Sequence, residues 1–193
     1  MSKTWEIEEL VADACQFAAQ QHGTQARKGT AIPYIVHPLN VAKYLIRYGA
    51  GTNLAIAGVL HDVVEDTPAT LEQVRERYGD RVAELVEHAS EPDKNADWRT
   101  RKEHTVNAAR VCQDLEMLAL KCADKLDNLK DIRFDYGHEG DALWERFNTP
   151  LGKSDQQWYY SALCEVFTAK LNGTQWQGLA DELTCELNAI FGH

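Results

Sequence analysis

Residues 60–67 read LHDVVEDT and place one imidazole and three carboxylates at the end of an apolar run. From Asn53 to Val64 that run is otherwise mostly Ala, Ile, Leu, Val and Gly, which predicts a buried helix that ends at Thr67-Pro68. On one helix at 100° per residue, the histidine and the three acids would all lie within about 140° of each other. A buried carboxylate without a partner is costly, so these acids need a cation or a polar cavity to face. The alternative is a helix end whose acids simply point to solvent.

The composition is that of an acidic globular chain. With 193 residues, 44% of them hydrophobic, the chain is long enough for one sizeable core, and we expect a single domain over residues 1–193. No apolar run approaches the roughly 18 residues of a membrane span, the N-terminus has no apolar signal core, and the five cysteines include no Cys-x-x-Cys pair. These features predict a reduced, cytoplasmic protein. The net charge of −10 argues against nucleic-acid and membrane partners, and leaves an anionic small molecule bound through a metal and local cations.

The other segments also carry apolar residues at helical spacing, separated by short loops. Capping boxes of the form Ser/Thr-x-x-Gln/Glu, which start helices, begin at Thr70, Thr100, Ser154 and Thr174. Asp114 is placed to cap a longer helix. We therefore predict an all-α fold, a bundle of helices of ordinary length.

Two loops interrupt this pattern. Residues 24–38 are rich in Gly, Pro and Thr and are not expected to be helical, although a short hairpin could form near residues 28–36. His22, just before this loop, is expected at the surface or at a helix end. The polar, proline-containing stretch Glu91–Trp98 is the expected mobile loop.

Four histidine and aspartate residues are placed to supply one divalent metal. His37 lies on the first loop, His61-Asp62 lies on the buried helix, and Asp124 lies on a later helix with a core face. Two imidazoles and two carboxylates suit Mn²⁺, Fe²⁺ or Zn²⁺ and leave positions open for water and substrate.

The motifs around these residues resemble the HD-domain phosphohydrolases. Arg27-Lys28 precedes PYIVHP at 33–38, and LHDVVEDT at 60–67 is followed by ADKLDNL at 123–129. The similarity runs from about Ala14 to Ile132. The basic pair and the Glu-Asp pair within LHDVVEDT resemble one branch in particular, the hydrolase domain of bifunctional alarmone synthetase/hydrolases and the stand-alone small alarmone hydrolases.

The resemblance implies an HD-domain helical bundle and a role for each candidate residue. One divalent metal, expected to be Mn²⁺, would be held by four ligands: His37, His61, Asp62 and Asp124. The attacking water would be oriented or activated by two carboxylates, Glu65 and Asp66. The nucleotide pocket would be lined by three polar side chains: Arg27, Lys28 and Asn128.

The family reaction removes pyrophosphate from the ribose 3′ position of guanosine tetra- or pentaphosphate and gives GDP or GTP. The implied partner is a small-molecule nucleotide, and a homo-oligomer stays open. Lys130 stands where several relatives carry arginine, and residues 29–32 differ from many relatives, which leaves open an adenosine-preferring alarmone hydrolase. Another HD-domain nucleotide phosphohydrolase would release orthophosphate instead. A catalytically silent nucleotide sensor would be expected to have lost Glu65 or Asp66, and both are present.

Overall fold

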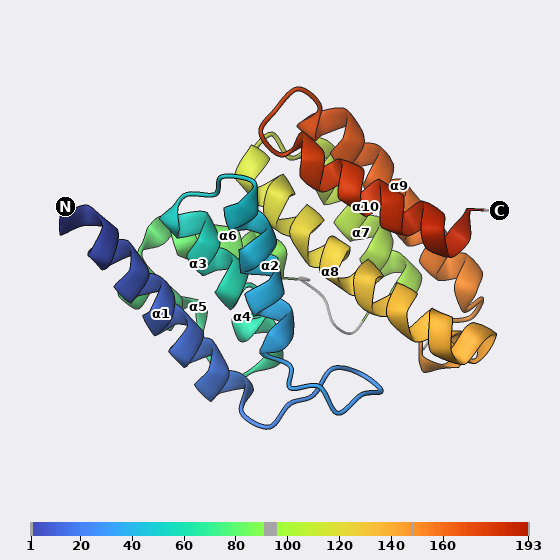
Figure 1. Ribbon diagram of the computed structural model, residues 1–193, viewed down its shortest axis with the longest axis horizontal. Helices are drawn as coiled ribbons and strands as arrows, with labels where there is room; N and C mark the ends of the chain where they lie inside the picture. The colour runs from blue at the N-terminus through green and yellow to red at the C-terminus, as the bar shows by residue number, and fades with distance from the viewer. Residues whose placement is uncertain (1, 91–95, 148, 193) are drawn as a thin grey trace. The chain divides into compact units, whose positions relative to one another are not determined.

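The computed structural model describes residues 2–90, 96–147 and 149–192, with side chains from residue 8 onward (Figure 1). This part of the chain contains no β-strand, so the prediction of an all-α fold is confirmed. Its α-helices are α1 (Ser2–His22), α2 (Val36–Arg47), α3 (Thr52–Leu60), α4 (Val63–Asp66), α5 (Leu71–Tyr78), α6 (Asp80–Ala89), α7 (Trp98–Val111), α8 (Leu115–Glu139), α9 (Lys153–Leu171) and α10 (Gln177–Phe191), and a 3-10 helix, η1 (Gly140–Arg146), follows α8. Most of the predicted mobile loop Glu91–Trp98 lies outside the described residues.

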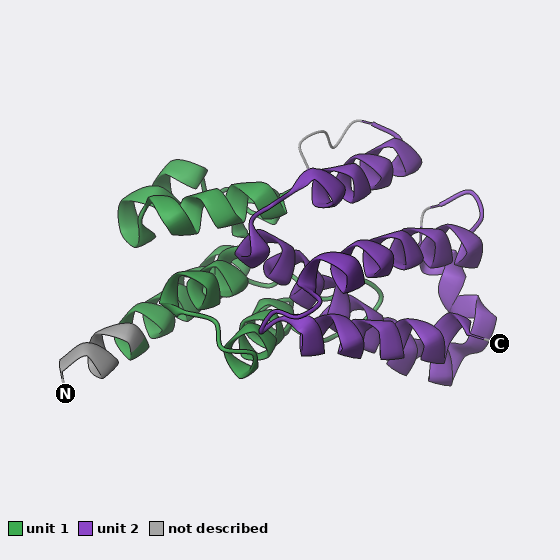
Figure 2. Ribbon diagram, turned by 90° about the horizontal axis from the view of Figure 1, so that it is seen from above, with its two compact units in different colours: residues 1–90 green, residues 91–193 purple. Residues whose placement is uncertain are grey.

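The chain divides into two compact units, Met1–Ser90 and Glu91–His193, which Figure 2 colours separately. The first unit holds α1 to α6, and the second holds α7 to α10 together with η1. The single domain expected over residues 1–193 stays a prediction.

Helix α3 is the centre of the first unit. Its residues from Leu54 to Leu60 are all buried, and it packs against α1, α2 and α6 (Figure 1). Gly58 faces α2, where an added Cβ would lie only 2.9 Å from Cδ1 of Leu45 and 3.1 Å from Cα of Ala42. The missing side chain therefore allows α2 and α3 to approach closely.

The single helix predicted through residues 53–64 is wrong in one respect, because it is interrupted. Helix α3 ends at Leu60, and α4 begins at Val63. Between them Asp62 has φ −98° and ψ −6°, in the region that bridges the helical and extended conformations. The N–H of Asp66 still donates to the Asp62 carbonyl at 2.8 Å, so a short helix restarts at once. The acids at its end therefore do not lie on the same continuous helix as His61.

The loop between α1 and α2 folds back on itself without forming a strand. Ala26 and Pro33 make an isolated antiparallel bridge, and the N–H of Arg27 donates to the Ile32 carbonyl at 2.9 Å. At the tip of the loop Gly29 has a φ of 77°, which favours glycine. The hairpin expected in this loop is thus reduced to a hairpin-shaped turn.

Helix α8, the long yellow helix in Figure 1, is the centre of the second unit and packs against α9, α10 and η1. It begins at the predicted cap, where the Asp114 carboxylate accepts the N–H of Glu116 at 2.9 Å. Further along, the Lys130 ammonium donates to the Glu182 carboxylate of α10 at 2.9 Å. Lys130 therefore ties α8 to α10.

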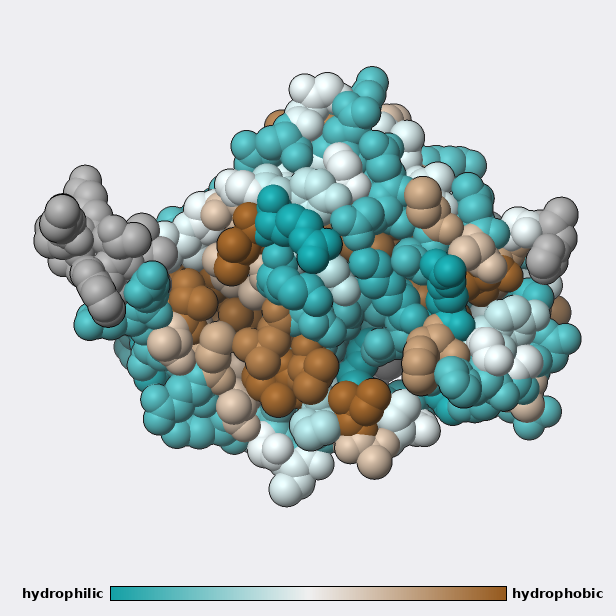
Figure 3. All heavy atoms as spheres, viewed as in Figure 1, coloured by the Kyte–Doolittle hydropathy of each residue, from teal (hydrophilic) through white to brown (hydrophobic). Residues whose placement is uncertain are grey.

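The molecular face in Figure 3 mixes hydrophilic and hydrophobic side chains. The exposed large hydrophobic residues of the described chain include Val36, Leu39 and Ile46 of α2. Exposed apolar side chains of this kind are ordinary on folded proteins. No described helix has both the length and the apolar character needed to cross a membrane.

Candidate metal centre

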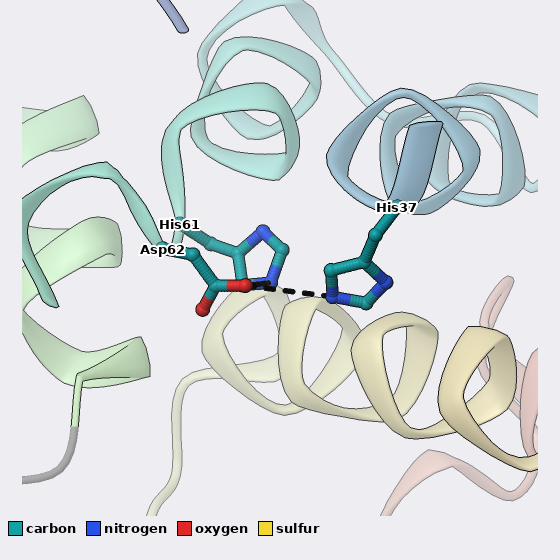
Figure 4. Close-up of side chains that lie close together, drawn as sticks. All are labelled: His37, His61 and Asp62. Atoms are coloured by element: carbon teal, nitrogen blue, oxygen red, sulfur yellow. Dashed lines mark ion pairs between the residues drawn. The ribbon is translucent and has the colours of Figure 1, made fainter. Parts of the chain in front are cut away.

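Three side chains of the first unit converge near the start of α2 and the end of α3 (Figure 4). The Nε2 atoms of His61 and His37 lie 3.0 Å and 3.5 Å from the same oxygen, Oδ2 of Asp62. One donor atom from each of the three residues lies within 4.8 Å of the other two. Both histidines are buried, whereas 18% of the Asp62 side chain is exposed. The sequence-predicted ligands of this unit are thus brought together at a point that a small ion can reach.

The two imidazoles are held in place by their surroundings. Nδ1 of His61 lies 2.9 Å from the carbonyl oxygen of Gly58, which can only accept, so Nδ1 carries a proton and Nε2 is the nitrogen that would bind a metal once it has lost its own proton. This is how metal-binding histidines are usually oriented, with the second nitrogen bonded to a backbone carbonyl. The His37 ring packs edge-on against the His61 ring, with centroids 5.0 Å apart. Both rings are therefore arranged before any ligand arrives.

The Asp62 carboxyl is held in its ionised form. Burial by itself raises its pKa, but the charge of a neighbouring His61 imidazolium and hydrogen bonds from both histidines outweigh burial and keep the pKa well below its usual range. An anionic oxygen next to two imidazole nitrogens is a site that favours positive charge. A divalent cation could supply that charge with both histidines neutral.

The donor set fits a divalent metal ion. Imidazole nitrogen and carboxylate oxygen are ligands accepted by Mn²⁺, Fe²⁺ and Zn²⁺, and three protein ligands leave coordination positions for water and substrate. The cluster of His37, His61 and Asp62 therefore matches the metal site that the sequence predicted for this unit.

The candidate catalytic acids follow the cluster on α4. Glu65 is half-buried and Asp66 is exposed. The Tyr34 hydroxyl lies 3.3 Å from Oδ2 of Asp66 and donates a shorter hydrogen bond, 2.6 Å, to Oδ2 of Asp62. Tyr34 thus connects the cluster to one of the acids, although sequence reasoning gave it no role. Its only signal in the sequence was its place three residues before His37.

The predicted substrate residues Arg27 and Lys28 lie on the loop between α1 and α2. The guanidinium carbon of the half-buried Arg27 lies 5.8 Å from the centroid of the Tyr34 ring, and Lys28 is exposed. Arg27 is therefore one contact away from the side chain that bonds Asp62. The nucleotide-binding role of both residues stays a prediction.

Asp124 and Asn128 lie one turn apart on α8, in the second unit. The Asn128 amide donates to Oδ1 of Asp124 and the Lys125 ammonium donates to Oδ2, each at 2.6 Å. Burial alone would lower the pKa of Lys125, but the charge of Asp124 keeps it well above its usual value. The Asp124 carboxylate is thus held in one orientation by two donors, and its role as fourth metal ligand stays a prediction, as does the substrate contact of Asn128.

Comparison with known proteins identifies the class to which this fold and cluster belong. A family model described as an HD domain matches residues 14–153, which include all the candidate site residues. The chain belongs to the HD-domain family.

Within this family the chain is similar to alarmone hydrolases. It is 40% identical over 128 residues to a guanosine-3′,5′-bis(diphosphate) 3′-pyrophosphohydrolase of Aquifex aeolicus (strain VF5), an alignment that covers 64% of this chain and 18% of that protein. It is 39% identical over 127 residues to the guanosine-3′,5′-bis(diphosphate) 3′-pyrophosphohydrolase MESH1 of Xenopus tropicalis, covering 64% of this chain and 70% of that protein.

A solved structure described as a metazoan ortholog of SpoT that hydrolyzes ppGpp superposes with a TM-score of 0.70 at 29% identity. The superposition covers 91% of this chain and 94% of that one. The chain thus matches stand-alone hydrolases over most of their length, but it spans less than a fifth of the Aquifex protein.

Proposed function

We propose that this chain hydrolyses the 3′-pyrophosphate of guanosine 3′,5′-bis(diphosphate)-type alarmones in a metal-dependent reaction. The observation that carries this proposal is the cluster of His37, His61 and Asp62, followed within one turn by the acids Glu65 and Asp66. The names of the similar proteins supply the substrate class.

In this proposal the metal is Mn²⁺, and Asp124 joins the three clustered residues as its fourth ligand. A bound divalent ion lowers the pKa of water and polarises a phosphoryl oxygen. Among divalent metals, Mn²⁺ accepts both nitrogen and oxygen donors and tolerates open positions, which suits a mixed set of two imidazoles and two carboxylates.

The protein groups carry the proton transfers and the positioning. Glu65 and Asp66 orient the attacking water and take up its proton, since both follow the cluster directly and neither is needed to complete the ligand set. The water oxygen forms a bond to the phosphorus that is attached to the ribose 3′ oxygen, and the bond between this phosphorus and the 3′ oxygen breaks. The 3′ oxygen receives the proton that the acids took from the water, and pyrophosphate leaves. The nucleoside 5′-di- or triphosphate is the other product.

Substrate binding relies on local cations in an otherwise acidic protein. Arg27 and Lys28 supply positive charge on the loop of the first unit, and Asn128 supplies an amide that can donate to the nucleotide. The planar guanidinium of Arg27 is also able to stack on a purine, as it already lies near the Tyr34 ring. Local positive charge of this kind can bind a polyanion although the net charge is −10.

Product analysis tests the proposal. The purified protein is incubated with guanosine 3′,5′-bis(diphosphate), and separately with its adenosine analogue, in the presence of Mn²⁺ or of a chelator. We expect GDP and pyrophosphate with Mn²⁺ and no products with the chelator. Faster turnover of the adenosine compound would shift the proposal to an adenosine-preferring alarmone hydrolase, and release of orthophosphate in place of pyrophosphate would contradict it.

A further inference from the structure

The Tyr34 hydroxyl lies between two carboxylates that have different proposed roles. Its oxygen is 2.6 Å from Oδ2 of Asp62 and 3.3 Å from Oδ2 of Asp66. A phenol has a single proton to donate, so the shorter bond to Asp62 takes most of it and the longer contact is secondary. The bonded Asp62 oxygen is also the one that faces Nε2 of both His37 and His61.

This geometry controls the direction in which Asp62 presents its charge. When the two histidines bind a metal they no longer donate to Oδ2, and without the tyrosine hydroxyl, rotation about the bond between Cβ and the carboxyl carbon could exchange the two oxygens. The hydroxyl of Tyr34 fixes one lone pair of Oδ2 and leaves another facing the imidazoles, where a metal would lie.

Tyr34 is itself held by a clasp of two residues, His22 and Gln25. The His22 ring packs on the Tyr34 ring with centroids 4.7 Å apart, and Nδ1 of His22 lies 2.9 Å from Oε1 of Gln25. The Gln25 amide donates to the backbone carbonyl of Asp66 at 2.8 Å, and the backbone N–H of Tyr34 donates to the Gln25 carbonyl at 2.9 Å. The clasp therefore joins the end of α1, the loop and the end of α4.

We propose that Tyr34 is a positioning residue that orients the Asp62 carboxylate for metal binding and holds the Asp66 carboxylate close to Asp62. The role of Tyr34 in orienting Asp62 rests only on the cluster of His37, His61 and Asp62. Its role in positioning Asp66 rests on the proposed function. Partners of metal ligands in this position typically contribute tenfold to a hundredfold in metal affinity or activity.

The substitution Tyr34→Phe isolates the hydroxyl. It keeps the ring that packs against His22 and His37, which lie 4.7 Å and 5.9 Å away between centroids, and removes the hydrogen bonds of the hydroxyl to the two carboxylates. A matched control exists in the same unit, because the Tyr78 hydroxyl donates to the Asp13 carboxylate at 2.9 Å and neither residue belongs to the cluster. Tyr78→Phe thus removes a tyrosine–aspartate hydrogen bond of the same kind.

Calorimetric titration of the metal-free full chain with Mn²⁺ is the first readout. We expect Tyr34→Phe to raise the dissociation constant for Mn²⁺ about tenfold to a hundredfold, and Tyr78→Phe to leave it within about twofold, while far-ultraviolet circular dichroism shows both variants folded. Equal Mn²⁺ affinity in Tyr34→Phe and the wild type would overturn the proposal, as would a wild type that binds no divalent metal.

Steady-state kinetics at saturating Mn²⁺ is the second readout. Because the hydroxyl donates to Asp62 and to the proposed catalytic Asp66, kcat should fall at least about tenfold with KM within about twofold. A change in KM alone would contradict the positioning of Asp66. If the wild type binds Mn²⁺ and Tyr34→Phe weakens that binding, but no alarmone is hydrolysed, then the proposed function fails while the orientation of Asp62 by Tyr34 stands.

Discussion

The substitution Gly58→Ala tests how the structure brings His37 and His61 together. The added Cβ would lie 2.9 Å from Cδ1 of Leu45 and 3.1 Å from Cα of Ala42, both on α2. The end of the leucine side chain can rotate away, but the backbone of Ala42 cannot, so α2 and α3 must separate by a few tenths of an ångström. One of these helices carries His37 and the other ends next to His61.

The expected loss of stability follows from two opposing terms. Overpacking a core by one methyl group costs about 1–3 kcal/mol, whereas replacing glycine by alanine inside a helix gains about 0.5–1 kcal/mol. The net result should be a destabilisation of up to about 2.5 kcal/mol, centred near 1 kcal/mol. Because ligands must be held within about 0.5 Å of their working geometry, we also expect Mn²⁺ to bind roughly threefold to tenfold more weakly.

Urea unfolding of the metal-free protein measures the first quantity, and calorimetric titration with Mn²⁺ measures the second. Gly137→Ala is the matched control, since Gly137 is an exposed glycine in α8 with no atom within 4 Å of an added Cβ. It should be neutral or stabilising by up to about 1 kcal/mol, with unchanged metal affinity. If Gly58→Ala behaves like Gly137→Ala in both assays, then close contact of α2 and α3 at this glycine does not set the geometry of the cluster.

Three further predictions concern the site. His61→Ala should abolish Mn²⁺ binding and alarmone hydrolysis while the circular dichroism spectrum stays helical. The control His138→Ala, at the exposed end of α8, should leave Mn²⁺ binding and hydrolysis unchanged. Full metal occupancy in His61→Ala would exclude this histidine as a ligand. Glu65→Gln should retain Mn²⁺ in calorimetric titration and lower kcat about a hundredfold, as is typical for a lost acid/base group, and unchanged turnover would remove Glu65 from the mechanism. Arg27→Ala and Lys28→Ala should each raise KM more than they lower kcat, with the larger effect at Arg27, and a normal KM in both would place the substrate elsewhere.

Helix starts could be predicted from sequence where one local signal dominates. The capping box at Thr70 is confirmed, because its side chain and that of Gln73 both make the expected bonds, and so is the cap at Asp114. The start predicted at Thr100 is wrong, because Asp97 lies three residues earlier and its carboxylate accepts the N–H of Thr100. The start predicted at Ser154 is also wrong, since the helix already begins after Gly152 without a side-chain cap.

Contacts between segments that are distant in the sequence could not be predicted from hydrophobic periodicity or motif spacing. His22 was expected at the surface or at a helix end, and it is the last residue of α1. It is nevertheless only 3% exposed, because the loop after α1 folds back and places Tyr34 against its ring. The hydrogen bond between Tyr34 and Asp62 spans 28 residues, so no local pattern could have indicated it. The clustering of His37, His61 and Asp62 was predictable because it rests on residue types within conspicuous motifs, whereas the residues that hold these side chains in place were not.

The interruption between α3 and α4 shows why helical spacing alone predicted the wrong geometry for the candidate residues. On a continuous helix the side chains of His61 and Asp62 would point about 100° apart. In the structure the chain departs from a regular α-helix at residues 61 and 62, and Oδ2 of Asp62 comes to lie 3.0 Å from Nε2 of the preceding histidine. The same departure ends the buried α3 and moves Glu65 and Asp66 onto α4, where they are half-buried and exposed respectively. Departures from regular structure concentrate at functional sites, and here one departure separates the proposed metal ligands, which are largely buried, from the acids that the proposed reaction needs near water.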